Sequence, residues 1–120
     1  MVKTITVPDI PKAGPYSHAV VTGNLIYLSG QVGTVSNKTT DLDEQFENAM
    51  SKIRRILEAG GFALENVVKT SVYLSKKEDF KRMNELYSKY FVVNPPARTT
   101  VVTGFPSGDT LVEIDVIASK

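Results

Sequence analysis

The sequence predicts an α+β fold in which two helices cover one face of a mixed, six-stranded β-sheet. Six segments read as strands and two as helices, in the order βββαβαββ. The strand–helix–strand steps imply parallel pairing, whereas the strand pairs at the two ends imply antiparallel hairpins, so the sheet should be mixed. Two helices can cover one face of such a sheet, and the other face is left without a helix.

The first half of the chain supplies three of these strands. Residues 3–7 suit a short edge strand that stops at a proline. Residues 19–21 and 25–32 flank the turn TGN and predict a β-hairpin. Residues 33–40 have the composition of a loop.

A helix is predicted over residues 41–59, where the period of the apolar residues changes. The apolar positions fall on one side at helical spacing: Leu42, Phe46, Ala49, Met50, Ile53, Ile56 and Leu57. Asp41 followed by Glu44 resembles a capping box, and Gly60-Gly61 supplies the stop.

The second half of the chain returns to a strand, a helix and two strands. Residues 66–75 place Val68, Thr70, Val72 and Leu74 on one face and Lys69, Ser71 and Tyr73 on the other. Ser75 with Glu78 resembles a second capping box and opens a helix that ends before Pro95. The predicted buried side of this helix is Phe80, Met83, Tyr87, Tyr90 and Phe91. Residues 98–103 and 110–119 follow as strands joined by the turn FPSGD.

Length and composition favour one domain over residues 1–120 and exclude several kinds of site. The chain has no cysteine, so it can form no disulfide, thiolate zinc site or cysteine nucleophile. Its single histidine, His18, suits an ordinary solvated side chain, and we expect no metal and no cofactor. The formal net charge of +1 is spread over mixed acids and bases, which argues against nucleic acid or an anionic membrane as partner. No signal peptide or membrane-spanning segment is recognised, which favours a cytoplasmic protein.

The face without helices is neither cleanly polar nor a second core. On the last strand, Val112, Ile114, Val116 and Ala118 form an apolar row, and Leu111, Glu113, Asp115 and Ile117 form the opposite one. The same parity groups Arg98, Thr100 and Val102 on the preceding strand, and Leu25, Tyr27, Ser29 and Gln31 in the hairpin. A face this apolar is expected to be buried against copies of the same chain. We therefore predict a homo-oligomer with Arg98 and Glu113 near its internal boundaries.

Each polar candidate also has an ordinary structural interpretation. Arg98 suits a solvated charge at a strand end, and Glu113 suits its ion-pair partner across the last hairpin. Tyr16 suits a turn residue whose ring packs locally, and Ser29-Gly30 suits a bulge or a close backbone approach. Asn84 suits a helix-surface amide.

Six stretches follow one another along nearly the whole chain: GPYSHAV at 14–20, IYLSGQVG at 26–33, GFALENVVKTSVYL at 61–74, FKRMNELYSKYF at 80–91, PPARTTV at 95–101 and LVEIDVIA at 111–118. Together they resemble the RidA family (also called YjgF) of enamine and imine deaminases. The resemblance implies the chorismate-mutase-like α+β fold. It also implies a homotrimer whose sheets form a central barrel, with ligand clefts between subunits.

The same resemblance implies the site residues. The arginine of the P-A-R segment falls on Arg98 and is expected to bind the substrate carboxylate. The glutamate of the V-E-I segment falls on Glu113 and is expected to hold the attacking water. The remaining cleft-lining positions fall on Tyr16, Ser29, Gly30 and Asn84.

Two features depart from the family pattern. The position two residues after the arginine, frequently cysteine in active members, is Thr100, which keeps a hydrogen-bonding oxygen in the substrate-binding cleft. We expect this to alter reactivity towards thiol reagents more than catalysis. The loop at 33–40 is shorter than usual and lacks the glycine-rich ending, which changes the expected shape of the cleft.

The implied function is hydrolysis of 2-imino acids, such as 2-iminopropanoate and 2-iminobutanoate, to 2-keto acids and ammonia. A carboxylate can dock on a planar guanidinium, and the C=N carbon is already electrophilic, so positioning a water is sufficient. Three alternatives stay open: a non-enzymatic module that binds small carboxylates in the same cleft, an RNA-directed activity, and a structural trimer with an inactive cleft. The near-neutral charge weighs against the RNA-directed activity.

Overall fold

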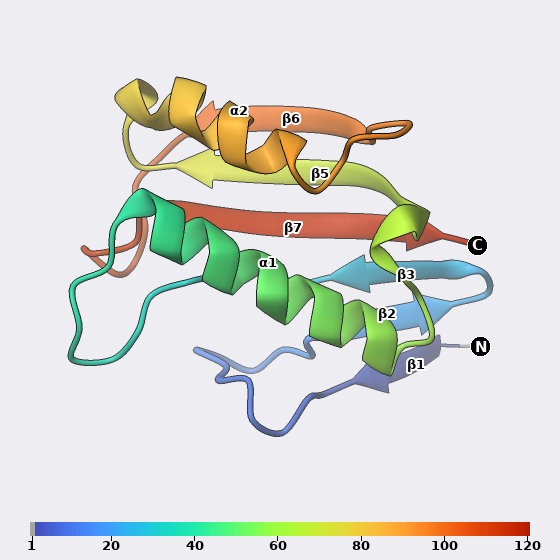
Figure 1. Ribbon diagram of the computed structural model, residues 1–120. Coiled ribbons are helices and arrows are strands. Elements are labelled where there is room, and N and C mark those ends of the chain that lie inside the picture. Colours follow the sequence, from blue (N-terminus) through green and yellow to red (C-terminus); the bar gives the residue numbers. More distant parts are fainter. Residues whose placement is uncertain (1) are drawn as a thin grey trace.

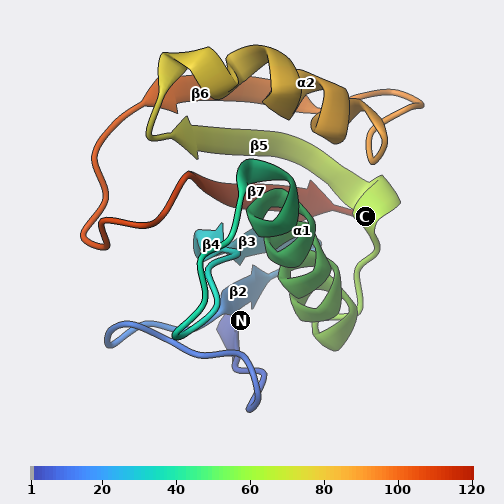
Figure 2. The same cartoon turned by 60° about the vertical axis from the view of Figure 1, so that its left-hand side comes forward.

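The computed structural model describes residues 2–120 and confirms the predicted α+β architecture, with both helices on one face of a mixed sheet (Figures 1 and 2). The strands are β1 (Val2–Ile5), β2 (Ala19–Thr22), β3 (Leu25–Leu28), β4 (Gln31–Val32), β5 (Val67–Leu74), β6 (Ala97–Val102) and β7 (Val112–Ser119). The helices are α1 (Leu42–Ala59) and α2 (Phe80–Ser88), and the short 3-10 turns η1 (Leu64–Asn66) and η2 (Lys77–Asp79) precede β5 and α2. No helix in residues 2–120 is long and apolar enough to cross a membrane.

The strand order is β1-β2-β3-β7-β5-β6, with β4 also paired to β7. β5 and β6 are parallel and joined through α2, as predicted. The predicted hairpin between the last two strands is wrong, because β7 lies between β3 and β5 and pairs antiparallel with both. Burial explains this arrangement: the inner row of β7 is at most 1% exposed and requires the sheet centre beneath α1.

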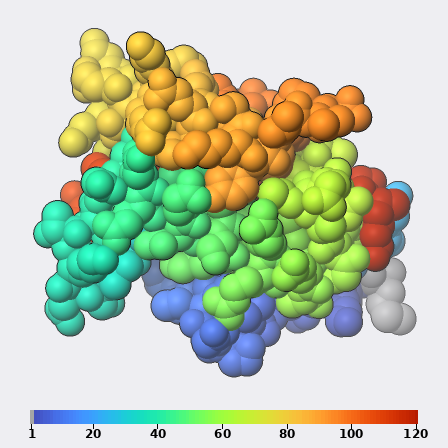
Figure 3. Space-filling model, in the orientation of Figure 1, coloured from blue at the N-terminus to red at the C-terminus, as the bar shows by residue number. Residues whose placement is uncertain are grey.

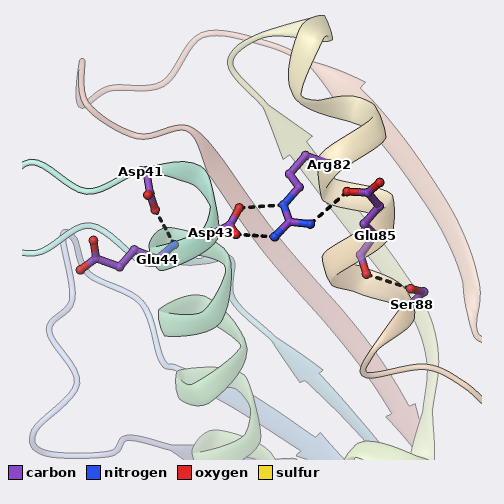
Figure 4. A network of polar contacts seen from close by, with 6 residues as sticks. All are labelled: Asp41, Asp43, Glu44, Arg82, Glu85 and Ser88. Carbon is purple, nitrogen blue, oxygen red and sulfur yellow. Dashed lines mark hydrogen bonds and ion pairs between the residues drawn. The ribbon is translucent and has the colours of Figure 1, made fainter.

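α1 carries the core of the domain. Its predicted apolar positions are all buried against the sheet, together with Gln45. At its start the Asp41 side chain accepts a hydrogen bond from the Glu44 N–H at 2.9 Å, which confirms Asp41 as the N-cap (Figure 4). The Glu44 side chain pairs with Lys38 and does not complete a capping box. From the helix side, the helices and their connections cover most of the sheet (Figure 3).

A polar link joins the start of α2 to the start of α1. Arg82 of α2 donates from Nε to Asp43 Oδ1 at 3.0 Å and from Nη1 to Glu85 Oε1 at 3.0 Å (Figure 4). Asp43 lies in the first turn of α1, and its hydrogen bond with Arg82 lowers the pKa of that carboxyl. The link therefore orients α2 against the start of α1.

The predicted strand at 25–32 is divided by a β-bulge, which accounts for the seventh strand. Tyr27 pairs with Ile117 and Gln31 pairs with Ile114, so β3–β4 contains one more residue than the facing segment of β7. Because of the extra residue, the side chains after the bulge point to the opposite face of the sheet from the one that regular alternation predicts. Gln31 therefore lies on the helix side at 5% exposure, and the prediction that it shares a face with Tyr27 is wrong.

A second irregularity occurs at the start of β5. The register shifts between Val67 and Lys69, so Val67 takes the buried position and Val68 is 49% exposed. The prediction that Val68 shares a face with Thr70, Val72 and Leu74 is therefore wrong. β1 also ends at Ile5, two residues before the predicted end at Val7.

The start of α2 differs from its prediction. The capping box of Ser75 and Glu78 does not form, because η2 intervenes and Asp79 becomes the N-cap residue without a side-chain cap. Phe80 is 46% exposed and Tyr90 is only partly buried, while Leu86 joins the core at 1% exposure. Phe80 lies in the first turn, where its ring flanks Arg98 instead of entering the core.

Candidate active site

The candidate residues lie in two groups on opposite faces of the sheet. Paired residues on neighbouring strands share a face. Arg98 pairs with Thr70, which is buried beneath the helices at 0% exposure. Glu113 pairs with Tyr73, on the face without helices. The expectation that the Arg98 row belongs to the open face is therefore wrong.

Arg98 lies half-buried on β6, beneath α2. Its Cζ is 4.8 Å from the centroid of the Tyr87 ring and 5.8 Å from that of Phe80. Its Nη1 lies 3.9 Å from Met83 Sδ. No carboxylate of residues 2–120 forms an ion pair with this guanidinium. Aromatic faces and a thioether thus hold Arg98 while its charge stays uncompensated.

Two further candidates accompany Arg98. Thr100 follows on the same face of β6, where it pairs with Val72 and is half-buried. Asn84 is also half-buried and lies four residues after Phe80 on α2, so it shares the side of the helix that borders Arg98. The structure therefore gathers Arg98, Thr100 and Asn84 at one edge of the sheet.

The sequence reasoning missed the role of the aromatic residues around Arg98, which it assigned to the core. The Tyr87 hydroxyl and Thr70 Oγ1 share a hydrogen bond of 2.8 Å, which fixes the ring beneath α2. Burial raises the pKa of the Tyr87 phenol, so the hydroxyl stays neutral. Aromatic residues at helical spacing, followed by a lone arginine on the next strand, are the signal that could have revealed this arrangement.

The second group is built by the bulge between β3 and β4. Ser29 donates its Oγ–H to the Ser17 carbonyl at 2.7 Å and its N–H to the His18 carbonyl at 3.0 Å. Gly30 then passes against the Glu113 side chain, so closely that a Cβ there would lie 2.3 Å from Glu113 Oε2. Both interpretations of the Ser29-Gly30 pair, a bulge and a close approach, therefore hold.

The environment of Glu113 disfavours its charged form. Burial raises the pKa of this carboxyl, and the nearby charge of Asp115 raises it further. Asp115 lies on the same face and accepts a hydrogen bond from the Tyr73 hydroxyl at 2.9 Å. A carboxylate with a raised pKa is a stronger proton acceptor, which suits a general base.

Tyr16 borders the same group from the loop before β2. The side chain is 41% exposed, and its hydroxyl accepts a hydrogen bond from the Ala13 N–H at 3.1 Å. Tyr16 and Gly30 both line a cavity of about 350 Å³ between this loop, the segment after β4 and α1. Tyr16, Ser29, Gly30 and Glu113 therefore lie together at the β4 end of the sheet.

His18 is not the solvated residue that was expected. It is 1% exposed, and Nδ1 accepts a hydrogen bond from the Val7 N–H at 2.9 Å. The proton of the neutral ring must then sit on Nε2, which has no hydrogen-bond partner within residues 2–120. His18 directly precedes β2, and its hydrogen bond with Val7 thus anchors the segment after β1.

Within one chain, Arg98 and Glu113 cannot meet on one small ligand. Glu113 lies level with Val101 across β5, so Arg98 is two strands away and about 14 Å distant along the backbone lattice, on the opposite face. The ion pair suggested across the last hairpin is absent, because that hairpin does not form. Within residues 2–120, no three His, Asp or Glu side chains gather as metal ligands either.

Comparison with known proteins places this arrangement in a family. The family described as Endoribonuclease L-PSP matches residues 7–120. A RutC family protein of Saccharolobus solfataricus is 45% identical over 112 residues, covering 89% of this chain and 88% of that protein. The human 2-iminobutanoate/2-iminopropanoate deaminase is 37% identical over 122 residues, covering 97% and 88%.

Solved structures agree with the sequence relatives. The crystal structure of RidA from an Antarctic Psychrobacter matches with a TM-score of 0.88 and 33% identity, covering 98% of this chain and 99% of that chain. The shared topology includes both helices on one face of a mixed sheet. The chain therefore belongs to the Endoribonuclease L-PSP family, the family of the RidA/YjgF proteins.

Proposed function

We propose that the protein hydrolyses the C=N bond of small 2-imino acids, such as 2-iminopropanoate and 2-iminobutanoate, in a cleft shared by two copies of the chain. The single observation that carries this proposal is the half-buried Arg98 guanidinium, which has no carboxylate partner within residues 2–120 of its own chain. A desolvated cation of this kind is suited to bind the carboxylate of a ligand.

The need for two copies follows from the opposite faces that Arg98 and Glu113 occupy. β6 is an edge strand with one neighbour, so a second chain can approach Arg98 from the free side. The open face carries exposed apolar side chains, including Tyr27 at 44% and Val101 at 41%. A homotrimer, as the family resemblance implies, would bury this face and bring Arg98 of one chain to Glu113 of the next.

The chemistry needs a fixed substrate and a held water. Arg98 binds the substrate carboxylate, and Glu113 accepts a proton from the water as its oxygen attacks C2. The C=N electron pair moves to nitrogen, which takes up a proton. Glu113 then returns its proton to the nitrogen. The C–N bond breaks as the hydroxyl group gives a proton back to the solvent, which supplied the first proton on nitrogen, and ammonia leaves the 2-keto acid. The substrate-binding residues are Tyr16, Ser29, Gly30, Asn84 and Thr100.

Trapping of a freshly generated imine tests the proposal. An amino-acid oxidase produces 2-iminopropanoate in situ, and semicarbazide captures whatever imine the protein has not hydrolysed. We expect the protein to suppress the trapped product. Arg98→Ala should lower the rate tens- to thousands-fold, equivalent to about 2 to 5 kcal/mol, because it removes the charge pair between the guanidinium and the substrate carboxylate. Lys89→Ala, which removes an exposed charge at the C-terminal end of α2, is the matched control.

The same assay separates the alternatives. If the protein binds pyruvate but does not reduce the amount of trapped imine, the deaminase is rejected and the carboxylate-binding module is favoured. Near-normal turnover by Arg98→Ala would reject Arg98 as the carboxylate ligand.

A further inference from the structure

The cavity beside Tyr16 and Gly30 contains a cation that the proposed reaction does not use. Lys52 reaches it from α1 and is half-buried. Its Nζ donates to the Val32 carbonyl at 2.8 Å. Within residues 2–120, this is its only hydrogen bond and it has no ion-pair partner. An ammonium carries three donors, so two N–H groups of Lys52 have no protein acceptor.

The surroundings of Lys52 leave its charge without compensation. Burial lowers the pKa of its ammonium, and no neighbouring carboxylate opposes that effect. Asp109 is the acidic residue on the cavity wall, and its carboxylate already accepts a hydrogen bond from Ser107. Lys12 lines the cavity as a second, exposed lysine. The cavity therefore has two cations and one engaged acid on its wall.

The position of the cavity links it to the proposed reaction centre. Gly30 lines the cavity and abuts the Glu113 carboxylate. Val32, whose carbonyl holds Lys52, is the residue paired with Glu113 across β4 and β7. Glu113 lies on the open face and Lys52 reaches the cavity from the helix side, but Gly30 lies against the Glu113 carboxylate and also lines the cavity, so the ligand considered below runs past Gly30 at the β4 end of the sheet.

We propose that the cavity binds a second acidic group, so that 2-imino acids whose short side chain ends in a carboxylate are the preferred substrates. The inference rests on the proposed function and names the substrate class for it. The reaction is unchanged: 2-iminobutanedioate and water give 2-oxobutanedioate and ammonia. Lys52 holds the distal carboxylate while Arg98 of the second chain holds the proximal one.

A pair of substrates of equal length tests this. 2-Iminobutanedioate and 2-iminobutanoate differ in the terminal carboxylate, and both can be generated in situ by amino-acid oxidases. We expect kcat/KM to favour the dicarboxylate by at least tenfold. Lys52→Gln keeps an N–H donor for the Val32 carbonyl but removes the charge. It should lower kcat/KM for the dicarboxylate by roughly 10- to 100-fold, the range for a hydrogen bond to a charged group, and leave the monocarboxylate within about twofold.

Two control variants separate charge from structure. Lys52→Arg retains a cation and should preserve the preference for the dicarboxylate. Lys89→Gln makes the same change at an exposed lysine outside the cavity and should alter neither substrate. Thermal unfolding of each variant shows whether Lys52→Gln stays folded. If Lys52→Gln does not fold, the wild type and Lys52→Arg are compared on the two substrates. Equal rates on the dicarboxylate and the monocarboxylate in both proteins would overturn the proposal.

Binding of unreactive analogues gives a readout without turnover. Calorimetry should show that butanedioate binds at least tenfold more tightly than butanoate, and that Lys52→Gln removes the difference. If no imine is hydrolysed but this Lys52-dependent binding is found, the proposed function fails and the anion subsite stands. If 2-iminobutanoate is hydrolysed and the dicarboxylate has no Lys52-dependent advantage in rate or binding, the subsite is overturned and the proposed function stands.

Discussion

β7 and β6 each carry one residue of the proposed reaction, and the two strands are held in very different ways. β7 has neighbours on both sides, and its inner row beneath α1 is almost inaccessible to solvent. β6 has one neighbour, and each of its residues is exposed or half-buried. Glu113 therefore projects from a central strand whose inner row is buried, whereas Arg98 lies on an edge strand, next to aromatic side chains of α2.

This difference shows how one small fold can assemble a two-residue site. A central strand is held from both sides, which suits the orientation of a water by Glu113. An edge strand offers the cation and a free side that a second chain can approach. The substitutions below test each region in turn.

The largest expected effect lies at Gly33, where the chain after β4 meets α1. Gly33 passes against the backbone of α1, and a Cβ there would lie 1.8 Å from the Gln45 carbonyl oxygen. Because neither backbone can yield easily, Gly33→Ala should lower the free energy of unfolding by about 3 kcal/mol or more. Urea denaturation measures this. Gly104→Ala, with nothing within 4 Å of the new Cβ, is the control and should be nearly neutral.

A smaller effect on stability, together with a loss of activity, is expected at Gly30, which lies beside Glu113. Gly30→Ala would place a Cβ 2.3 Å from Glu113 Oε2, the end of a side chain that can rotate away. Imine hydrolysis should fall by at least about tenfold, with a loss of stability below about 1.5 kcal/mol. Steady-state kinetics with a parallel melting curve tests both numbers. Unchanged kcat would contradict the assignment of Glu113.

At the edge, Tyr87→Phe should have a modest effect on stability. It removes the hydrogen bond with Thr70 Oγ1 and leaves that hydroxyl unpaired, at a cost of about 1 kcal/mol. The ring that faces Arg98 remains, so the KM for 2-iminopropanoate should be nearly unchanged. Tyr87→Leu removes the ring as well and should raise KM. Equal KM values in the two variants would argue against the cation–π contact.

The smallest effect concerns the pH dependence of the reaction. Burial and then Asp115 raise the pKa of Glu113, and the base must be deprotonated to act. Activity should therefore fall as the pH drops through this raised pKa, and Asp115→Asn should move the acidic limb to lower pH. Stability should respond with the opposite sign, because a raised folded-state pKa favours the folded protein at low pH and opposes it above that pKa. A limb that stays in place in Asp115→Asn would rule out this electrostatic coupling.

The sequence was sufficient for elements governed by regular alternation. The helical spacing from Leu42 to Leu57 and the apolar row of β7 were both predictable, because each is repeated often enough to define a buried side. Single-residue bulges at Ser29-Gly30 and at Val67/Lys69 were not, since one inserted residue reverses the faces without changing composition. Gln31 and Val68 were misplaced for this reason.

The order of the strands in the sheet also could not be predicted from local sequence patterns. Neighbouring strands in sequence were expected to pair, but the burial of β7 draws it to the centre and leaves β6 at the edge. That error placed Arg98 on the face of Glu113. The residues themselves were identified through the family resemblance, but their division between two faces required the structure.

Subunit complementation tests the two-chain site most directly. Arg98→Ala and Glu113→Gln chains, each inactive alone, are mixed in equal amounts, unfolded and refolded together. If every site takes Arg98 from one chain and Glu113 from another, about a quarter of the wild-type activity should return, because random assembly pairs an intact arginine with an intact glutamate at that frequency. Mixtures that remain as inactive as the separate variants would show that both residues must come from the same chain, which contradicts the account.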